Sequence, residues 1–125
     1  AVIDTMLSSA SRAGVVLADH ANHAAPPAAA AGLDPAASLA IDDDPVAVAL
    51  GLGQSLVAPR VSDLLTSGFR GALGLPDGRL ELPAYRAAVS TVSPSSCVVL
   101  DLRQLENPWR ALEQGRLAWE SAGVG

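Results

Sequence analysis

Lysine is absent from this chain, so all eight of its basic residues are arginines, against thirteen acidic residues and a formal net charge of −5. The arginines are spread from position 12 to position 116 without a cluster. A nucleic-acid-binding surface needs a basic field that displaces counterions, and an anionic membrane surface attracts polybasic segments. We therefore expect no nucleic-acid partner and no electrostatic membrane anchor. Arginine without lysine in an alanine-rich chain is typical of a GC-rich genome.

Cysteine and long apolar runs are also scarce. Cys97 is the single cysteine, which excludes an internal disulfide and favours a reducing compartment, so we expect a cytoplasmic protein. No run of about 18 apolar residues is present, and the start of the chain lacks a signal-peptide pattern, so no membrane span is expected. Aromatic residues make up 3% of the chain, so the core must be built mainly from aliphatic side chains.

Composition divides the chain into three parts. Apolar residues at spacings of three and four predict a helix within residues 1–19, although a short strand over 15–18 is an alternative. Residues 20–41 are rich in alanine and proline and include Pro26-Pro27, which predicts an extended connector. Residues 42–125 carry most of the larger apolar side chains and are predicted to form a compact helical domain.

Capping signals and apolar spacing place several helices in the third part. Asp44 followed by Pro45 is a typical helix start and predicts a helix over 46–57. Further helices are expected from Pro59 to about residue 73, over 83–92, and from Pro108 to about residue 122, where Asn107 would be the N-cap. Pro76-Asp77-Gly78 predicts a turn.

Short strands are possible over Arg79–Leu82 and Cys97–Leu102. The predicted fold class is therefore mostly α, a small domain of four to five helices, with an α+β domain carrying one or two short strands as the alternative. We find no internal repeat and no motif of a known family.

Two acidic or histidine-containing segments are candidate metal sites. Asp19, His20 and His23 would bring two imidazoles and a carboxylate to one side of a helix, but the four ligands of a structural zinc site are not available. Solvated histidines at a helix end are the alternative. The run Asp42-Asp43-Asp44 lacks the spacing of a calcium loop and is better explained as a helix N-terminus. No motif indicates a cofactor.

The helix after Asn107 carries a stripe of small and large apolar residues. Gly115, Ala118 and Trp119 belong to it, together with Ala111 and Leu112. Such a stripe suits close contact between helices, within the chain or between chains. Trp109 lies off the stripe and either covers the start of the helix or faces a partner. The predicted interface therefore comprises Trp109, Leu112, Gly115, Ala118 and Trp119.

These observations favour a non-catalytic interaction protein over an enzyme. Cys97 opens an apolar run, so it is expected to be buried rather than reactive. No nucleophile elbow or phosphate loop is present. We expect an accessory or assembly subunit of a larger bacterial complex, binding other subunits or its own copies. The alternatives are a small metal-binding domain or enzyme using Asp19, His20 and His23, and a ligand-binding domain with a pocket at the end of Cys97–Leu102.

Overall fold

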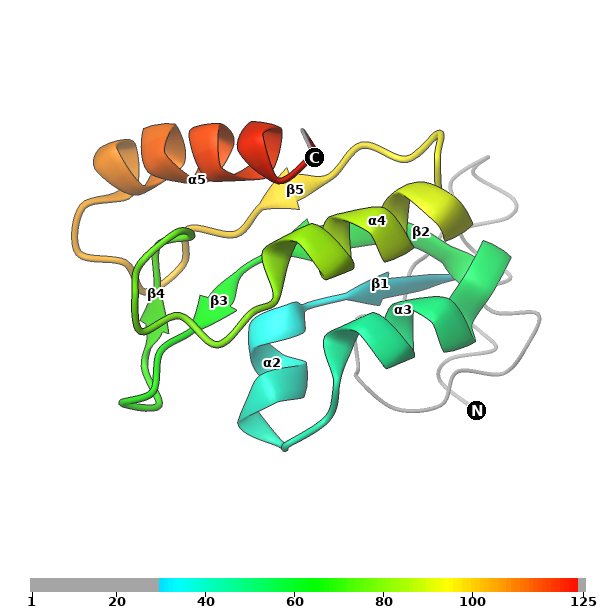
Figure 1. The fold of residues 1–125 in the computed structure, drawn as a ribbon, viewed down its shortest axis with the longest axis horizontal. Coiled ribbons are helices and arrows are strands. Elements are labelled where there is room, and N and C mark those ends of the chain that lie inside the picture. The colour runs from blue at the N-terminus through cyan, green and yellow to red at the C-terminus, as the bar shows by residue number, and fades with distance from the viewer. Residues whose placement is uncertain (1–29, 124–125) are drawn as a thin grey trace, which may run out of the picture.

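A computed structural model describes residues 30–123 of the chain. This part contains four α-helices, a three-stranded parallel sheet and a two-stranded antiparallel sheet (Figure 1). The elements in chain order are β1 (Ala31–Leu33), α2 (Pro35–Ala40), α3 (Pro45–Leu52), a 3-10 turn (Gly53–Ser55), β2 (Leu56–Val61), β3 (Asp63–Leu64), β4 (Arg70–Gly71), α4 (Leu82–Val92), β5 (Val99–Leu100) and α5 (Pro108–Ala122).

The parallel sheet has the order β1-β2-β5, with β2 at its centre. Two crossovers build it: α2 and α3 connect β1 to β2, and the β3/β4 hairpin with α4 connects β2 to β5. Parallel strands require such crossovers, which are usually helical. Helices α3 and α4 lie side by side in front of the sheet, and α5 continues the row beyond α4 (Figure 1).

The core lies between these helices and the sheet. Tyr85 of α4 is fully buried, and its hydroxyl donates a hydrogen bond of 2.7 Å to the carbonyl oxygen of Arg60 in β2. This bond satisfies the polar end of the ring, so the rest of the side chain can pack in an apolar environment. The other buried members of the core cluster are Leu33, Ala49, Leu56, Val61, Leu73, Ala88 and Val89.

The prediction of a mostly α fold is wrong, because the described part is mixed α/β. The main error of this prediction is the helix expected from Pro59 to about residue 73. Pro59 resembled a helix start, but it lies inside β2, one residue before the pairing with β5 begins. Gly68 has φ of +90° and lies in the loop between β3 and β4, which interrupts the apparent helical spacing.

Other elements were misplaced at their ends. The helix expected over 46–57 ends at Leu52, because Gly53 has φ of +54° and β2 follows. Residues 31–40, expected in the connector, form β1 and α2, since the pairing with β2 stabilises a strand of low intrinsic propensity. No strand forms over Arg79–Leu82, where Leu82 starts α4. The helix predicted within residues 1–19 and the first part of the connector, residues 20–29, lie outside the described residues and stay predictions.

Several local predictions are confirmed. The Asp44 carboxylate caps α3 by accepting from the backbone N–H of Val46 at 3.0 Å. Helix α4 spans nearly the range expected, and α5 begins at Pro108 with Asn107 as its N-cap. Strand β5 lies within the expected segment Cys97–Leu102. In the described part, no helix is long and apolar enough to cross a membrane.

Candidate functional site

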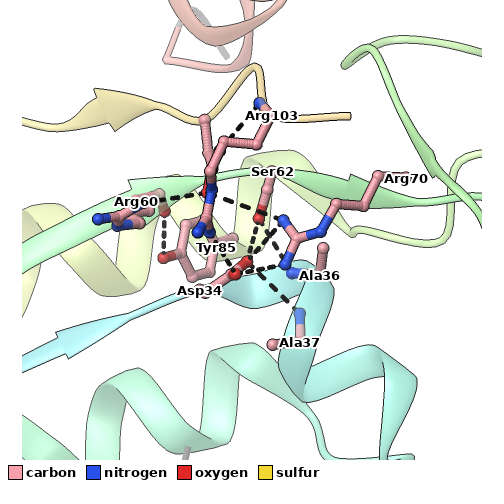
Figure 2. A network of polar contacts seen from close by, with 9 residues as sticks. Asp34, Ala36, Ala37, Arg60, Ser62, Arg70, Tyr85 and Arg103 are labelled. Atoms are coloured by element: carbon pink, nitrogen blue, oxygen red, sulfur yellow. Dashed lines mark hydrogen bonds and ion pairs between the residues drawn. The ribbon is translucent and has the colours of Figure 1, made fainter. Parts of the chain in front are cut away.

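The carboxyl ends of the three parallel strands bring polar residues together. Asp34 follows β1, Ser62 follows β2, and Asp101 follows β5. In an open α/β sheet this edge is where ligands and functional side chains usually gather. Three arginines join the cluster: Arg60 from β2, Arg70 from β4 and Arg103 from the loop after β5 (Figure 2). We call these six residues the carboxyl-edge network.

Asp34 is held from several sides. Its Oδ1 accepts a hydrogen bond of 2.6 Å from the Ser62 hydroxyl and one of 3.4 Å from the backbone N–H of Ala37, so it also caps α2. Arg70 donates from both terminal nitrogens, with Nη2 at 2.5 Å from Oδ2 and Nη1 at 3.3 Å from Oδ1. This bidentate contact fixes the plane of the guanidinium group beside the sheet (Figure 2).

Asp101 organises the second half of the network. Arg103 donates to it from Nε and from Nη2, the latter at 2.6 Å, and Arg60 Nη1 lies 3.1 Å from Oδ2. The Asp101 side chain is 1% exposed, whereas that of Arg103 is 62% exposed. Arg103 Nη2 also lies 3.4 Å from Asp34 Oδ2, so one guanidinium group links the two carboxylates.

The electrostatics of this network favour ionised carboxylates. Burial would raise the pKa of Asp34, but the hydrogen bonds from Arg70 and Ser62 outweigh it, so the pKa lies below its usual value. The hydrogen bonds from Arg103 hold the pKa of Asp101 well below its usual range. Carboxylates of low pKa are weak bases, so Asp34 is poorly suited to activate the Ser62 hydroxyl as a nucleophile. The arrangement therefore favours binding or structural roles over acid–base catalysis.

Asp63 is buried next to this network but serves the backbone. Its Oδ1 accepts hydrogen bonds from the backbone N–H groups of Leu64, Arg79 and Leu80, at 2.8, 3.1 and 2.9 Å. Burial raises the pKa of Asp63 even though these three bonds favour the charged form. A Cβ at Gly78 would overlap its carboxylate, so the glycine allows this close approach. Asp63 thus ties the hairpin to the start of α4.

A cavity of about 480 Å³ lies beside the network, between β4 and the first turns of α5. Its floor and walls combine apolar side chains with amides and three charged groups. Arg70 contributes to both the network and the cavity wall. The lining residues are Leu65, Ser67, Phe69, Arg70, Gly71, Ala72, Leu75, Gln104, Leu105, Glu106, Asn107, Arg110, Ala111 and Gln114. The cavity lies just beyond the strand at which the sequence suggested a pocket.

Helix α5 has two different faces. On the inner face, a Cβ at Gly115 would lie 3.1 Å from Leu100, so the glycine lets the helix approach β5 closely. Trp119 packs edge-on against Tyr85, with ring centroids 6.5 Å apart, and Arg86 stacks over its ring at 5.2 Å. On the outer face, Trp109 is 81% exposed, and Leu112 and Leu117 are also exposed.

The structure separates the residues that the sequence singled out as an interface. Gly115, Ala118 and Trp119 contact the chain's own core, whereas Trp109 and Leu112 remain on the outer face. Cys97 is exposed, so the prediction that it is buried is wrong: the strand begins two residues later, at Val99.

The proposed metal ligands Asp19, His20 and His23 lie outside the described residues. Within residues 30–123, no three His, Cys, Asp or Glu side chains are grouped so that they could hold a metal ion.

The network itself was missed by the sequence analysis. A signal was present, since Asp34, Ser62 and Asp101 each follow a short, mainly apolar segment. Because the segment before Ser62 was predicted to be helical, the sequence analysis did not predict the parallel sheet that brings the three residues to one edge. Comparison with models of protein families, with curated proteins and with solved structures gave no match to this chain.

Proposed function

We propose that this protein is a non-catalytic accessory or assembly subunit that docks onto a protein partner through the outer face of α5. We define this face by its exposed apolar residues Trp109, Leu112 and Leu117. The exposure of Trp109 carries the proposal. At about 25 cal/mol per Å² and about 200 Å² for an indole side chain, leaving it in water forgoes on the order of 4 kcal/mol of burial.

The rest of α5 supports a docking role. Its inner face is packed against the core, so the outer residues are presented on a rigid helix and lose little freedom on binding. Arg116 and Glu120 form an ion pair of 3.0 Å on the exposed side, which would supply polar contacts around an apolar centre. Tryptophan is also among the residues most enriched at the energetic centre of protein interfaces.

The chemistry of the carboxyl-edge network supports the non-catalytic part of the proposal. Its two carboxylates are held by arginines and have lowered pKa values, which suits fixed ion pairs better than proton transfer. We place the protein in the cytoplasm of a bacterium, with other subunits or its own copies as partners. The single cysteine is consistent with a reducing compartment.

The test compares substitutions on two surfaces of the purified full-length chain: the outer face of α5 and a site away from it. Trp109→Ser with Leu112→Ser should abolish co-elution with partner subunits from a native lysate, measured by size exclusion with light scattering and mass spectrometry. Ile41→Ser, which removes an exposed apolar side chain away from α5, should leave the complex intact. A folded wild-type monomer that enters no complex, or equal loss in both variants, would contradict the proposal.

A further inference from the structure

The cavity beside the carboxyl-edge network has features of a ligand site that the outer face of α5 does not share. Its volume of about 480 Å³ lies within the range of small-molecule sites in proteins, about 300–1,000 Å³. Apolar side chains form much of its wall, among them Leu65, Leu75 and Leu105. Phe69 lines the cavity but is 75% exposed, so an apolar body bound there would cover a ring that now faces water.

The charges around the cavity favour an anion. Arg70, Arg110 and Glu106 are its charged lining residues. Arg70 is fixed by Asp34, and the network behind it contains three guanidinium groups for two carboxylates, both ionised. Arg110 forms no ion pair with any residue of the described part. The network and the cavity lining together hold four guanidinium groups, of Arg60, Arg70, Arg103 and Arg110, and three carboxylates, of Asp34, Asp101 and Glu106. The buried carboxylate of Asp63 faces backbone N–H groups instead, so Arg110 is the lining cation left for an anion.

Residues with hydrogen-bond donors line the same cavity as the uncommitted Arg110. Gln104 and Gln114 are among them. The Asn107 amide oxygen is engaged by the backbone N–H of Arg110 at 3.1 Å, which leaves its NH₂ group as the available donor. A guanidinium group together with amide donors suits the chemistry of a carboxylate, which accepts several hydrogen bonds at once.

We infer that this cavity binds a small organic acid with one carboxylate and an apolar, ring-sized body. The carboxylate binds Arg110 and the amide donors, and the apolar body packs between Phe69 and the leucines. Arg70 contributes a fixed positive charge but no bidentate hydrogen bond to the ligand, because both of its terminal nitrogens are hydrogen-bonded to Asp34. This site is separate from the outer face of α5 and does not depend on the proposed docking function.

The experiment is a titration of the ¹⁵N-labelled full-length chain followed by amide chemical shifts, with three probes. Phenylacetate has the charge and the ring, phenylacetamide has the ring alone, and acetate has the charge alone. We expect saturable shifts with phenylacetate at Gly71, Gln104 and Ala111, and affinities about tenfold lower for the other two probes. Equal affinity for phenylacetamide would exclude the charge contribution, and equal affinity for acetate would exclude the apolar one.

Two arginine variants on the same helix complete the test. Arg110→Gln should lower the affinity for phenylacetate about tenfold, whereas Arg116→Gln, on the exposed side of α5, should leave it unchanged. Both substitutions remove one positive charge from an exposed helical position, so they control for net charge and for folding. Equal affinities of the two variants, or no saturable shift in the wild-type chain, would overturn the inference.

Discussion

The two tryptophans of α5 lie ten residues apart and have opposite environments. Trp119 packs against Tyr85 and under Arg86, and the Arg86 guanidinium also donates to the Trp119 carbonyl oxygen. Trp109 is 81% exposed and follows the helix N-cap by two residues. The same residue type therefore serves stability at one end of the helix and is available for recognition at the other. Substitutions that separate these two roles test the comparison.

The largest expected effect is at the inner tryptophan. Trp119→Ala should lower the free energy of unfolding by about 3 kcal/mol, because it leaves a cavity beside Tyr85 and removes the ring under Arg86. Trp109→Ala should change it by less than about 0.5 kcal/mol. Urea denaturation followed by circular dichroism measures both, since tryptophan fluorescence would itself change. Equal losses in the two variants would remove the distinction between the two faces.

A second contrast concerns ion pairs that face inward and outward. The side chains of Arg70 and Asp34 are 19% and 9% exposed, whereas those of Arg116 and Glu120 are 55% and 58% exposed. Asp34→Asn should lower the free energy of unfolding at pH 7 by about 2 kcal/mol, because it leaves the partly buried Arg70 with only its longer ion pair to Asp101, at 3.8 Å. Asparagine keeps an oxygen that can cap α2, so a full loss of folding would contradict the electrostatic explanation.

The pH dependence of stability provides an independent check of that explanation. The folded-state pKa values of Asp34 and Asp101 lie below the unfolded value of 3.8, so their contribution is complete above about pH 5 and is lost as the pH falls further. Asp63 has a raised pKa and acts in the opposite direction, which offsets part of the loss. The difference between wild type and Asp34→Asn should therefore shrink as the pH is lowered from 5 to about 2. A constant difference would assign the effect to packing.

Close approach on the inner face of α5 should also be measurable. In Gly115→Val the new side chain meets Leu100, and we expect a loss of about 1.5 kcal/mol from overpacking. Gly51→Val in α3 is the matched control, because a Cβ at Gly51 meets no atom within 4 Å. The control should be neutral or slightly stabilising, since valine favours a helix more than glycine does. Chemical denaturation of both variants tests the contact, and equal losses would show that the contact with Leu100 is not the cause.

The sequence predicted the local features of α5 but not their environment. Asn107, Pro108 and the apolar stripe determine where the helix begins and which side is buried, and these signals are local. The exposure of Trp109 depends on which elements pack against the helix, and this is a property of the fold. The carboxyl-edge network was missed for the same reason. Asp34 and Asp101 are 67 positions apart, and they meet because β1 and β5 both pair with β2. The central strand was not predicted, because Pro59 resembles the start of a helix.

The smallest expected effect is at the outward-facing ion pair. Glu120→Gln removes the partner of Arg116, yet the free energy of unfolding should fall by no more than about 0.4 kcal/mol, because water screens exposed i,i+4 pairs. In 0.5 M NaCl the wild type and the variant should become indistinguishable by urea denaturation, whereas Asp34→Asn should keep most of its deficit, since partly buried pairs are screened less. A larger, salt-resistant loss in Glu120→Gln would mean that the outer face of α5 contributes to folding. The two tryptophans would then differ in position but not in the division between stability and recognition.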